Sequence, residues 1–107
     1  MKFTDVETAF SYFEAFTNLA KKTHYTVRTY RLDRMAALLD HFRHPEKSFK
    51  SIHIAGSKGK GSTGVFIRAG LSAKGYRTGL YVSPHVSTYR ERFTIDGQFI
   101  SDEILLE

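Results

Sequence analysis

Apolar residues recur at helical spacing near the start of the chain. Four of them fall three or four positions apart: Val6, Phe10, Phe13 and Phe16. This spacing predicts an amphipathic helix over residues 5–20 with these side chains in the core. Thr4 and Glu7 have the spacing of a capping box, which would start the helix.

A second amphipathic helix is predicted over residues 32–43. Its apolar face is made of Leu32, Met35, Ala36, Leu39 and Phe42. Pro45 is expected to stop this helix, because a proline inside a helix removes a hydrogen bond and clashes with the preceding turn. We expect the apolar face to lie in the core.

The apolar pattern changes after Pro45. Ile52 and Ile54 indicate a short strand, and a glycine-rich loop follows. Residues 62–74 then return to helical spacing, with Gly75 as the terminating glycine. Residues 79–82 indicate a further buried strand. A strand, loop, helix and strand within about thirty residues predict a βαβ unit, whose two strands would be parallel.

A hairpin is predicted beyond this unit. Residues 93–95 and 98–100 flank the dipeptide Asp96-Gly97, which is typical of a type I′ turn. Ser101 would then cap another helix. Parallel strands are stable when both faces are covered, so we expect the front end of a larger domain that folds only marginally alone.

Composition narrows the class of protein. The 107 residues are 41% hydrophobic and include no cysteine, which excludes disulfides and thiolate metal sites and fits a reducing cytoplasm. No apolar run approaches the roughly 20 residues of a membrane span. We therefore expect a soluble, cytoplasmic chain with no membrane partner.

Charge is distributed unevenly. The net charge is +5, and no Asp or Glu lies between Lys47 and Arg90, a stretch that holds eight Lys and Arg residues. Such a segment attracts anions, phosphate above all. A solubilising basic surface would have the same composition. A nucleic-acid-binding protein would also have this composition, but the sequence contains no recognition helix or RNA motif, so we expect no nucleic-acid partner.

The glycine loop lies inside this basic stretch, in HIAGSKGKGSTGVF (residues 53–66). Its candidate phosphate-binding residues are Gly56, Ser57, Lys58, Gly59, Lys60, Gly61 and Ser62. Backbone N–H groups at the start of a helix can surround a phosphate, and the helix dipole favours negative charge there. Lys60 is the catalytic candidate, since its ammonium could neutralise the β and γ phosphates, and the Ser62 hydroxyl could contact phosphate or Mg²⁺.

The loop departs from the strict Walker A pattern, because Ile54 replaces the first glycine and Gly61 separates Lys60 from Ser62. Residues 59–64 also match GxGxxG, but the acidic residue that NAD binding needs about 20 positions later is missing. Two further alternatives for the glycine loop are an NADP site that uses Arg77 and a flexible surface loop.

Several ordered motifs together resemble folylpolyglutamate synthase and dihydrofolate synthase, which are members of the Mur ligase superfamily. The motifs are AGSKGKGS (55–62), GYRTGLYVSPH (75–85), ERF (91–93), the dipeptide Asp96-Gly97 and LDRM (32–35). Ser57 and Lys58 stand where the family's TNGKG pattern has Thr and Asn. The fold expected is thus α/β, an incomplete P-loop-containing, parallel-sheet nucleotide-binding domain with two leading helices, one βαβ unit and a hairpin.

The resemblance implies a reaction and its cofactors, ATP and Mg²⁺. ATP would phosphorylate a folate or dihydropteroate carboxylate, and the amine of L-glutamate would attack the acyl phosphate to form an amide. Ser83 would be a Mg²⁺ ligand together with Ser62. Arg34, His85 and Arg92 would contact substrate. The residues alone favour a surface histidine at position 85, and they allow ion pairs of the two arginines with Asp33 and Glu91.

The resemblance also implies that residues 1–107 are the N-terminal part of the ATP-binding domain. The other metal ligands, a modified lysine and the C-terminal domain would follow position 107, and the full enzyme would be a monomer. We therefore expect no ligation by this chain alone. A generic P-loop nucleotide-binding module or ATPase without folate specificity is the alternative.

Overall fold

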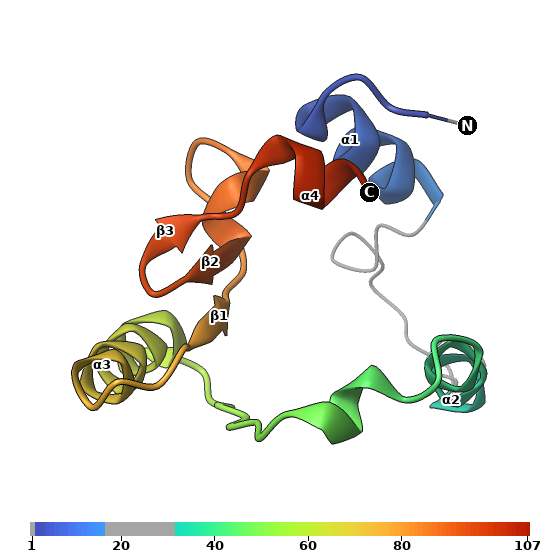
Figure 1. The fold of residues 1–107 in the computed structure, drawn as a ribbon. Helices are drawn as coiled ribbons and strands as arrows, with labels where there is room; N and C mark the ends of the chain where they lie inside the picture. The colour runs from blue at the N-terminus through green and yellow to red at the C-terminus, as the bar shows by residue number, and fades with distance from the viewer. Residues whose placement is uncertain (1, 17–31) are drawn as a thin grey trace. The chain divides into compact units, whose positions relative to one another are not determined.

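The structure is a computed structural model that describes residues 2–16 and 32–107. The chain divides into two compact units, one of Met1–Thr17 with Ile54–Glu107 and the other of Asn18–His53. Among the described residues, the first unit contains three α-helices, a short 3₁₀ helix and three strands, and the second contains one α-helix and one 3₁₀ helix (Figure 1).

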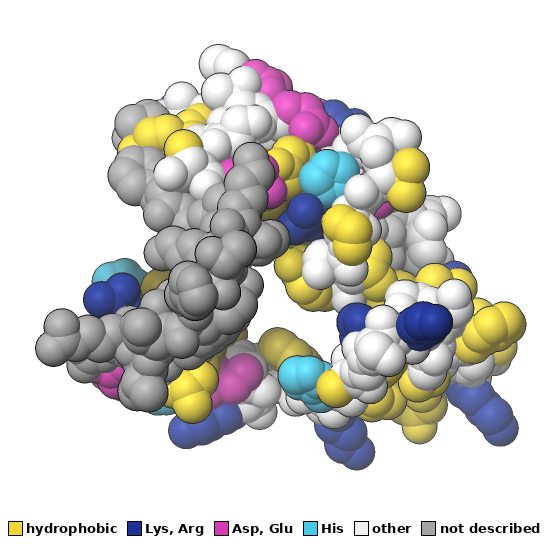
Figure 2. Space-filling model, turned by 180° about the vertical axis from the view of Figure 1, so that it is seen from behind, with side chains coloured by type: hydrophobic (Ala, Val, Ile, Leu, Met, Phe, Trp, Pro, Cys, Tyr) yellow, Lys and Arg dark blue, Asp and Glu magenta, His cyan; other side chains and the backbone are white. Residues whose placement is uncertain are grey.

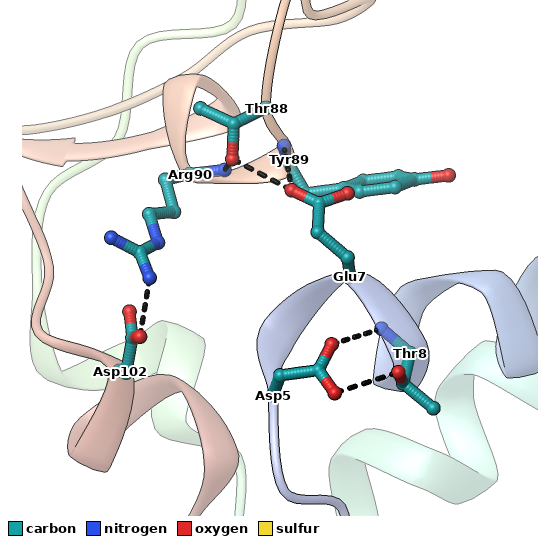
Figure 3. Close-up of polar contacts among 7 residues, drawn as sticks. All are labelled: Asp5, Glu7, Thr8, Thr88, Tyr89, Arg90 and Asp102. Carbon is teal, nitrogen blue, oxygen red and sulfur yellow. Dashed lines mark hydrogen bonds and ion pairs between the residues drawn. The ribbon is translucent and has the colours of Figure 1, made fainter.

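Helix α1 (Val6–Phe16) confirms the first predicted helix over its described part; residues 17–20 lie outside the described residues. Its N-terminus is capped by Asp5, not by Thr4. The Thr8 N–H donates to Asp5 Oδ1 at 2.7 Å, and the Thr8 hydroxyl donates to Oδ2 at 2.7 Å (Figure 3). The predicted capping box of Thr4 and Glu7 is wrong because Asp5 is the capping residue, one position later, and the Glu7 carboxylate binds Thr88 and Tyr89 instead.

The core of the first unit lies between α1 and the 3₁₀ helix η3 (Tyr89–Arg92). Val6, Ala9 and Tyr89 are its buried residues among those described. The Phe10 ring stacks on Tyr89, with centroids 4.6 Å apart and planes 7° apart. Phe13 is 60% exposed, so its prediction as a core residue was wrong: its ring lies against Phe3 and Tyr12.

The three strands form one antiparallel sheet in the order β1-β2-β3. They are β1 (Gly79–Tyr81), β2 (Phe93–Ile95) and β3 (Gln98–Phe99). Thr94 pairs with Leu80 on one side and with Phe99 on the other. The predicted hairpin of β2 and β3 is confirmed. Asp96 and Gly97 at its turn have φ of 51° and 82°, the positive values that a type I′ turn requires.

Helix α3 (Lys60–Ala73) begins two residues earlier than predicted. Its end is as predicted: Gly75 donates to the Ser72 carbonyl at 2.9 Å and Tyr76 to the Leu71 carbonyl at 3.1 Å, which is a Schellman motif. The helix packs against β1 at Gly64, the buried residue of α3. A Cβ on Gly64 would lie 3.0 Å from Leu80 Cδ1, so a larger residue would push α3 away from the strand.

The predicted strand at residues 52–54 does not form. The parallel sheet and the βαβ unit expected from the sequence both needed this strand, so these two predictions are wrong for the described residues. The chain has no regular structure from residue 51 to 56, and β1 pairs only with β2. A parallel strand is stabilised by burial on both faces, whereas Ile52 is 62% exposed. What is confirmed is the coarser class, helices together with a small sheet.

The second unit holds α2 (Leu32–His41), followed by η2 (Pro45–Ser48). The helix ends before Pro45 through its own C-terminal bonds: Arg43, with φ of 60°, donates to the Asp40 carbonyl and His44 to the Leu39 carbonyl. This is again a Schellman motif, so the proline follows the stop and does not cause it.

The apolar face of α2 is not buried, contrary to the sequence prediction. No residue of α2 is buried. The exposed fractions are 83% for Leu32, 53% for Met35 and 63% for Phe42, which follows the helix. Among the described residues 32–53 of its unit, no segment buries this face. Apolar side chains are also visible on the surface in Figure 2, interspersed with basic ones.

The chain ends in α4 (Asp102–Leu106), with Ser101 at its N-cap position as predicted. The Ser101 side chain makes no capping hydrogen bond. In the first unit α4 lies beside α1 (Figure 1). Among the described residues, no helix is both long enough and apolar enough to span a membrane.

Candidate nucleotide-binding site

The glycine loop of residues 56–62 leads directly into α3. Gly59 is the N-cap residue, with φ of 73°, a left-handed conformation that glycine adopts without the strain of a Cβ. The first intrahelical bond joins the Thr63 N–H to the Gly59 carbonyl at 2.9 Å. The N–H groups of residues 60–62 come before it and therefore have no acceptor within the helix.

The helix start is also free of negative charge. No acidic residue lies in the first turn of α3, and no side chain caps it. Because the unpaired N–H groups carry partial positive charge, this end of the helix favours an anion. Ser57, Lys58, Gly61 and Ser62 are all exposed there.

Lys60 is the first residue of α3, and its side chain folds back over the loop. Its Nζ donates to the Gly56 carbonyl at 2.6 Å. Side chains at a helix start point toward the N-terminus, which explains how a helical lysine reaches a residue four positions earlier. One of the three ammonium donors is used by Gly56, and two are left for an anion above the loop.

Ser83 lies two residues beyond β1, on the exposed segment that follows the strand. The preceding residue fixes the start of this segment, because the Val82 N–H donates to the Arg92 carbonyl at 3.1 Å. The Ser83–Pro84 peptide is cis. Neither the Ser62 nor the Ser83 hydroxyl has a hydrogen-bond partner among the described residues, so both oxygens are available to a ligand.

His85 and Arg92 are two of the predicted substrate residues, and the fold brings them together. Arg92 Nε donates to His85 Nδ1 at 2.9 Å. The His85 ring lies 4.2 Å from the Tyr89 ring, and the Arg92 guanidinium lies 5.1 Å from the centre of the same ring. Since Nδ1 accepts this bond, Nε2 is the ring nitrogen left to face other groups.

Arg92 does not pair with Glu91, the neighbour that the sequence offered as its alternative partner. Its guanidinium lies 4.0 Å from Glu14 of α1. The Glu14 carboxylate also accepts from the Tyr89 hydroxyl, and this hydrogen bond raises the pKa of Tyr89. Arg34, the third predicted substrate residue, is exposed on α2 in the other unit.

Two carboxylates that the sequence prediction missed organise the segment around His85. Glu91 accepts from the N–H groups of Val86, Ser87 and Thr88. These bonds, led by the one from Thr88, lower the pKa of Glu91. The sequence contained a signal for this role of Glu91: Thr88 and Glu91 have the spacing of a capping box, and η3 has this capping box.

The second missed carboxylate is Glu7 of α1, which points at the start of η3 (Figure 3). Its Oε1 accepts from the Thr88 hydroxyl at 2.7 Å and from the Tyr89 N–H at 3.3 Å. Local spacing gave no signal for this contact, because more than 80 residues separate Glu7 from its partners. Arg90 forms an ion pair with Asp102 of α4 on the other side of the turn.

Comparison with known proteins was made at the level of families, sequences and structures. No family model matches the chain. It is 46% identical over 72 residues to the dihydrofolate synthase/folylpolyglutamate synthase of Bacillus subtilis, covering 67% of this chain and 17% of that protein. It is 56% identical over 61 residues to a folylpolyglutamate synthase of Arabidopsis thaliana, covering 57% of this chain and 10% of that protein.

A solved structure shows the same likeness. The crystal structure of folylpolyglutamate synthase from Thermotoga maritima superimposes with a TM-score of 0.65 at 37% identity, over 89% of this chain and 21% of that one. The chain is thus an α/β polypeptide that shares both sequence and fold with proteins named folylpolyglutamate synthase. It is a relative of the folylpolyglutamate and dihydrofolate synthases, which confirms the resemblance inferred from its motifs. The chain spans about a fifth or less of the length of these relatives.

Proposed function

We propose that the chain is the nucleotide-binding part of an ATP-dependent ligase that adds L-glutamate to a folate or dihydropteroate carboxylate through an acyl phosphate. The observation that carries the proposal is the start of α3, where unpaired N–H groups and the Lys60 ammonium converge on the glycine loop. The names of the relatives support the folate substrate and the ligase class.

The residues of the loop fit a triphosphate. Gly59 allows the backbone to turn into the helix, the first turn carries no acidic residue, and the Lys60 ammonium already lies over the loop. The N–H groups would bind phosphate oxygens, and Lys60 would neutralise charge as the terminal phosphoryl group is transferred. The serine hydroxyls of residues 62 and 83 are the candidate Mg²⁺ ligands.

Mg²⁺ would supply charge neutralisation at the phosphates. The oxygen donors proposed for it suit a hard cation, and no group of three or more Asp, Glu, His or Cys residues among the described ones forms a closed metal site. Mg²⁺ usually keeps several waters and takes few protein ligands, so an exposed pair of hydroxyls is consistent with this chemistry.

The acceptor substrate would lie near His85 and Arg92. A guanidinium binds a carboxylate through two parallel hydrogen bonds, and the imidazole would add an Nε2–H donor. The full-length enzyme would be a cytoplasmic monomer. Arg34 remains a proposed substrate contact by resemblance alone.

Binding of ATP by the 107-residue chain tests the loop. We expect Lys60→Ala to weaken ATP affinity about tenfold, or about 1.4 kcal/mol, in isothermal titration calorimetry with Mg²⁺. Lys74→Ala is the matched control, because Lys74 is an exposed lysine at the opposite end of the same helix. Equal affinities of Lys60→Ala and the parent chain would contradict the assignment.

A generic nucleotide-binding module or ATPase would pass the same test, so a second measurement separates the two functions. In the ligase, dihydropteroate or folate added at saturation should change the ATP affinity, because both substrates bind one reaction centre. In a generic module the affinity would be unchanged. Binding is the suitable readout because amide formation is not expected from this chain alone.

A further inference from the structure

The segment between β1 and η3 is positioned without apolar burial. Val86, at its centre, is 92% exposed, and Ser83, Pro84 and Ser87 are exposed as well. A segment with so little buried surface gains almost nothing from the hydrophobic effect. Apart from the contacts of the His85 side chain with Tyr89 and Arg92, its conformation must therefore depend on hydrogen bonds to its backbone.

Glu91 supplies these hydrogen bonds from inside the loop. Its Oε2 accepts from three successive N–H groups, those of Val86 at 3.1 Å, Ser87 at 2.7 Å and Thr88 at 2.8 Å. Hydrogen bonds to an ionised acceptor are about twice as strong as neutral ones. Together with the bond from Val82 to the Arg92 carbonyl, the carboxylate closes residues 82–92 into one loop.

Other charged groups surround this loop. His85 lies close enough for a positive charge on it to favour the ionised Glu91. From α1, Glu7 binds Thr88 and Tyr89, and Glu14 lies near Arg92. From α4, Asp102 pairs with Arg90. None of these groups binds the three N–H groups that Glu91 holds.

We propose that Glu91 is a positioning residue for the ligase site. Its carboxylate closes the loop of residues 82–92 and thereby sets where Ser83 and His85 lie. The inference rests on the proposed function, which gives Ser83 to Mg²⁺ and His85 to the substrate. Glu91 itself makes no hydrogen bond to Ser83 or His85; it acts through the backbone of the loop that carries these two residues.

Nuclear magnetic resonance of the 107-residue chain tests the first step. The amide protons of residues 86–88 should shift together as the pH falls and Glu91 becomes protonated, with a midpoint below the ordinary pKa of a glutamate. Glu103 is an exposed carboxylate of α4 that makes no hydrogen bond or ion pair among the described residues. In Glu91→Gln this common shift should vanish, while the amides of α3 keep their positions and show that the fold is intact. In Glu103→Gln it should persist.

Nucleotide binding tests the positioning role. Glu91→Gln should leave the affinity for ATP without Mg²⁺ unchanged and reduce the gain from Mg²⁺ about tenfold, the usual effect of losing a group that orients a metal ligand. Glu103→Gln should keep the full gain. An unchanged Mg²⁺ gain in Glu91→Gln, or amides 86–88 that do not titrate with Glu91, would overturn the inference. If the parent chain binds no ATP, the proposed function fails, and the amide titration still decides whether Glu91 holds the loop.

Discussion

Asp96 shows at the residue scale how one carboxylate ties together segments that are distant in sequence. Its Oδ1 accepts from the Thr78 N–H at 2.9 Å and from the Ser72 hydroxyl at 2.8 Å, while its backbone occupies the hairpin turn. The Thr78 N–H, followed by the Ser72 hydroxyl, lowers the pKa of Asp96. The charged form is thus favoured by folding.

The pH dependence of stability follows from this shift. A carboxyl whose pKa is lower in the folded state stabilises the fold above its unfolded pKa, about 3.9, and loses that contribution as the pH falls through the folded value. Asp96→Asn keeps the tolerance for positive φ but removes the charge. We expect it to lower the melting temperature at pH 7 and to flatten the decline in acid, as measured by circular dichroism. A parallel decline in both proteins would contradict the role of the charge.

At the element scale, the contact of α3 with β1 depends on the absence of a side chain at Gly64. Its Cβ would meet Leu80 Cδ1 at 3.0 Å and Ile54 Cδ1 at 3.6 Å. We expect Gly64→Val to lower the free energy of unfolding by about 1–3 kcal/mol, the usual cost of overpacking, in urea denaturation.

Gly70 is the matched control on the same helix, because a Cβ there would meet nothing within 4 Å. Gly70→Ala should raise the free energy of unfolding by about 0.5–1 kcal/mol through helix propensity. The opposite signs of the two substitutions are the test. A stabilising Gly64→Val would mean that α3 does not pack on β1 in solution.

At the scale of the whole molecule, the first unit depends on a very small core. Val6 is 3% exposed, whereas Val86, in the same unit, is 92% exposed. Val6→Ala should therefore cost about 2 kcal/mol, and Val86→Ala less than about 0.5 kcal/mol, in the same urea denaturation. Similar losses in the two variants would show that the buried contact of α1 with η3 does not stabilise the unit.

Prediction from sequence succeeded where a signal was local. Helical spacing found α1, α2 and α3, Gly75 marked the end of α3, and Asp96-Gly97 marked the hairpin turn. Each of these signals acts over a few residues, through backbone angles or through neighbours on one helix face. The candidate site at the start of α3 is also continuous in sequence, and its role in binding stays a prediction.

Prediction failed where the outcome depended on distant partners. Residues 52–54 have the composition of a strand, but a strand needs a neighbour to bond with, and β1 pairs with β2 instead. The apolar face of α2 was predicted correctly as a face and wrongly as core, because burial depends on what covers it. The cap of α1 depends on local interactions, yet the sequence did not decide between Thr4 and Asp5, because both residue types are good N-caps and the two are neighbours.

The sequence by itself determined where the helices run, where the chain turns and which family the chain resembles, because these depend on near neighbours and on ordered motifs. The tertiary structure alone decided that Glu7 binds Thr88 and Tyr89, and that His85, Tyr89 and Arg92 meet beside α1. Such contacts join positions up to 82 residues apart, and their geometry arises only when the packing of α1 on η3 brings them within hydrogen-bonding distance.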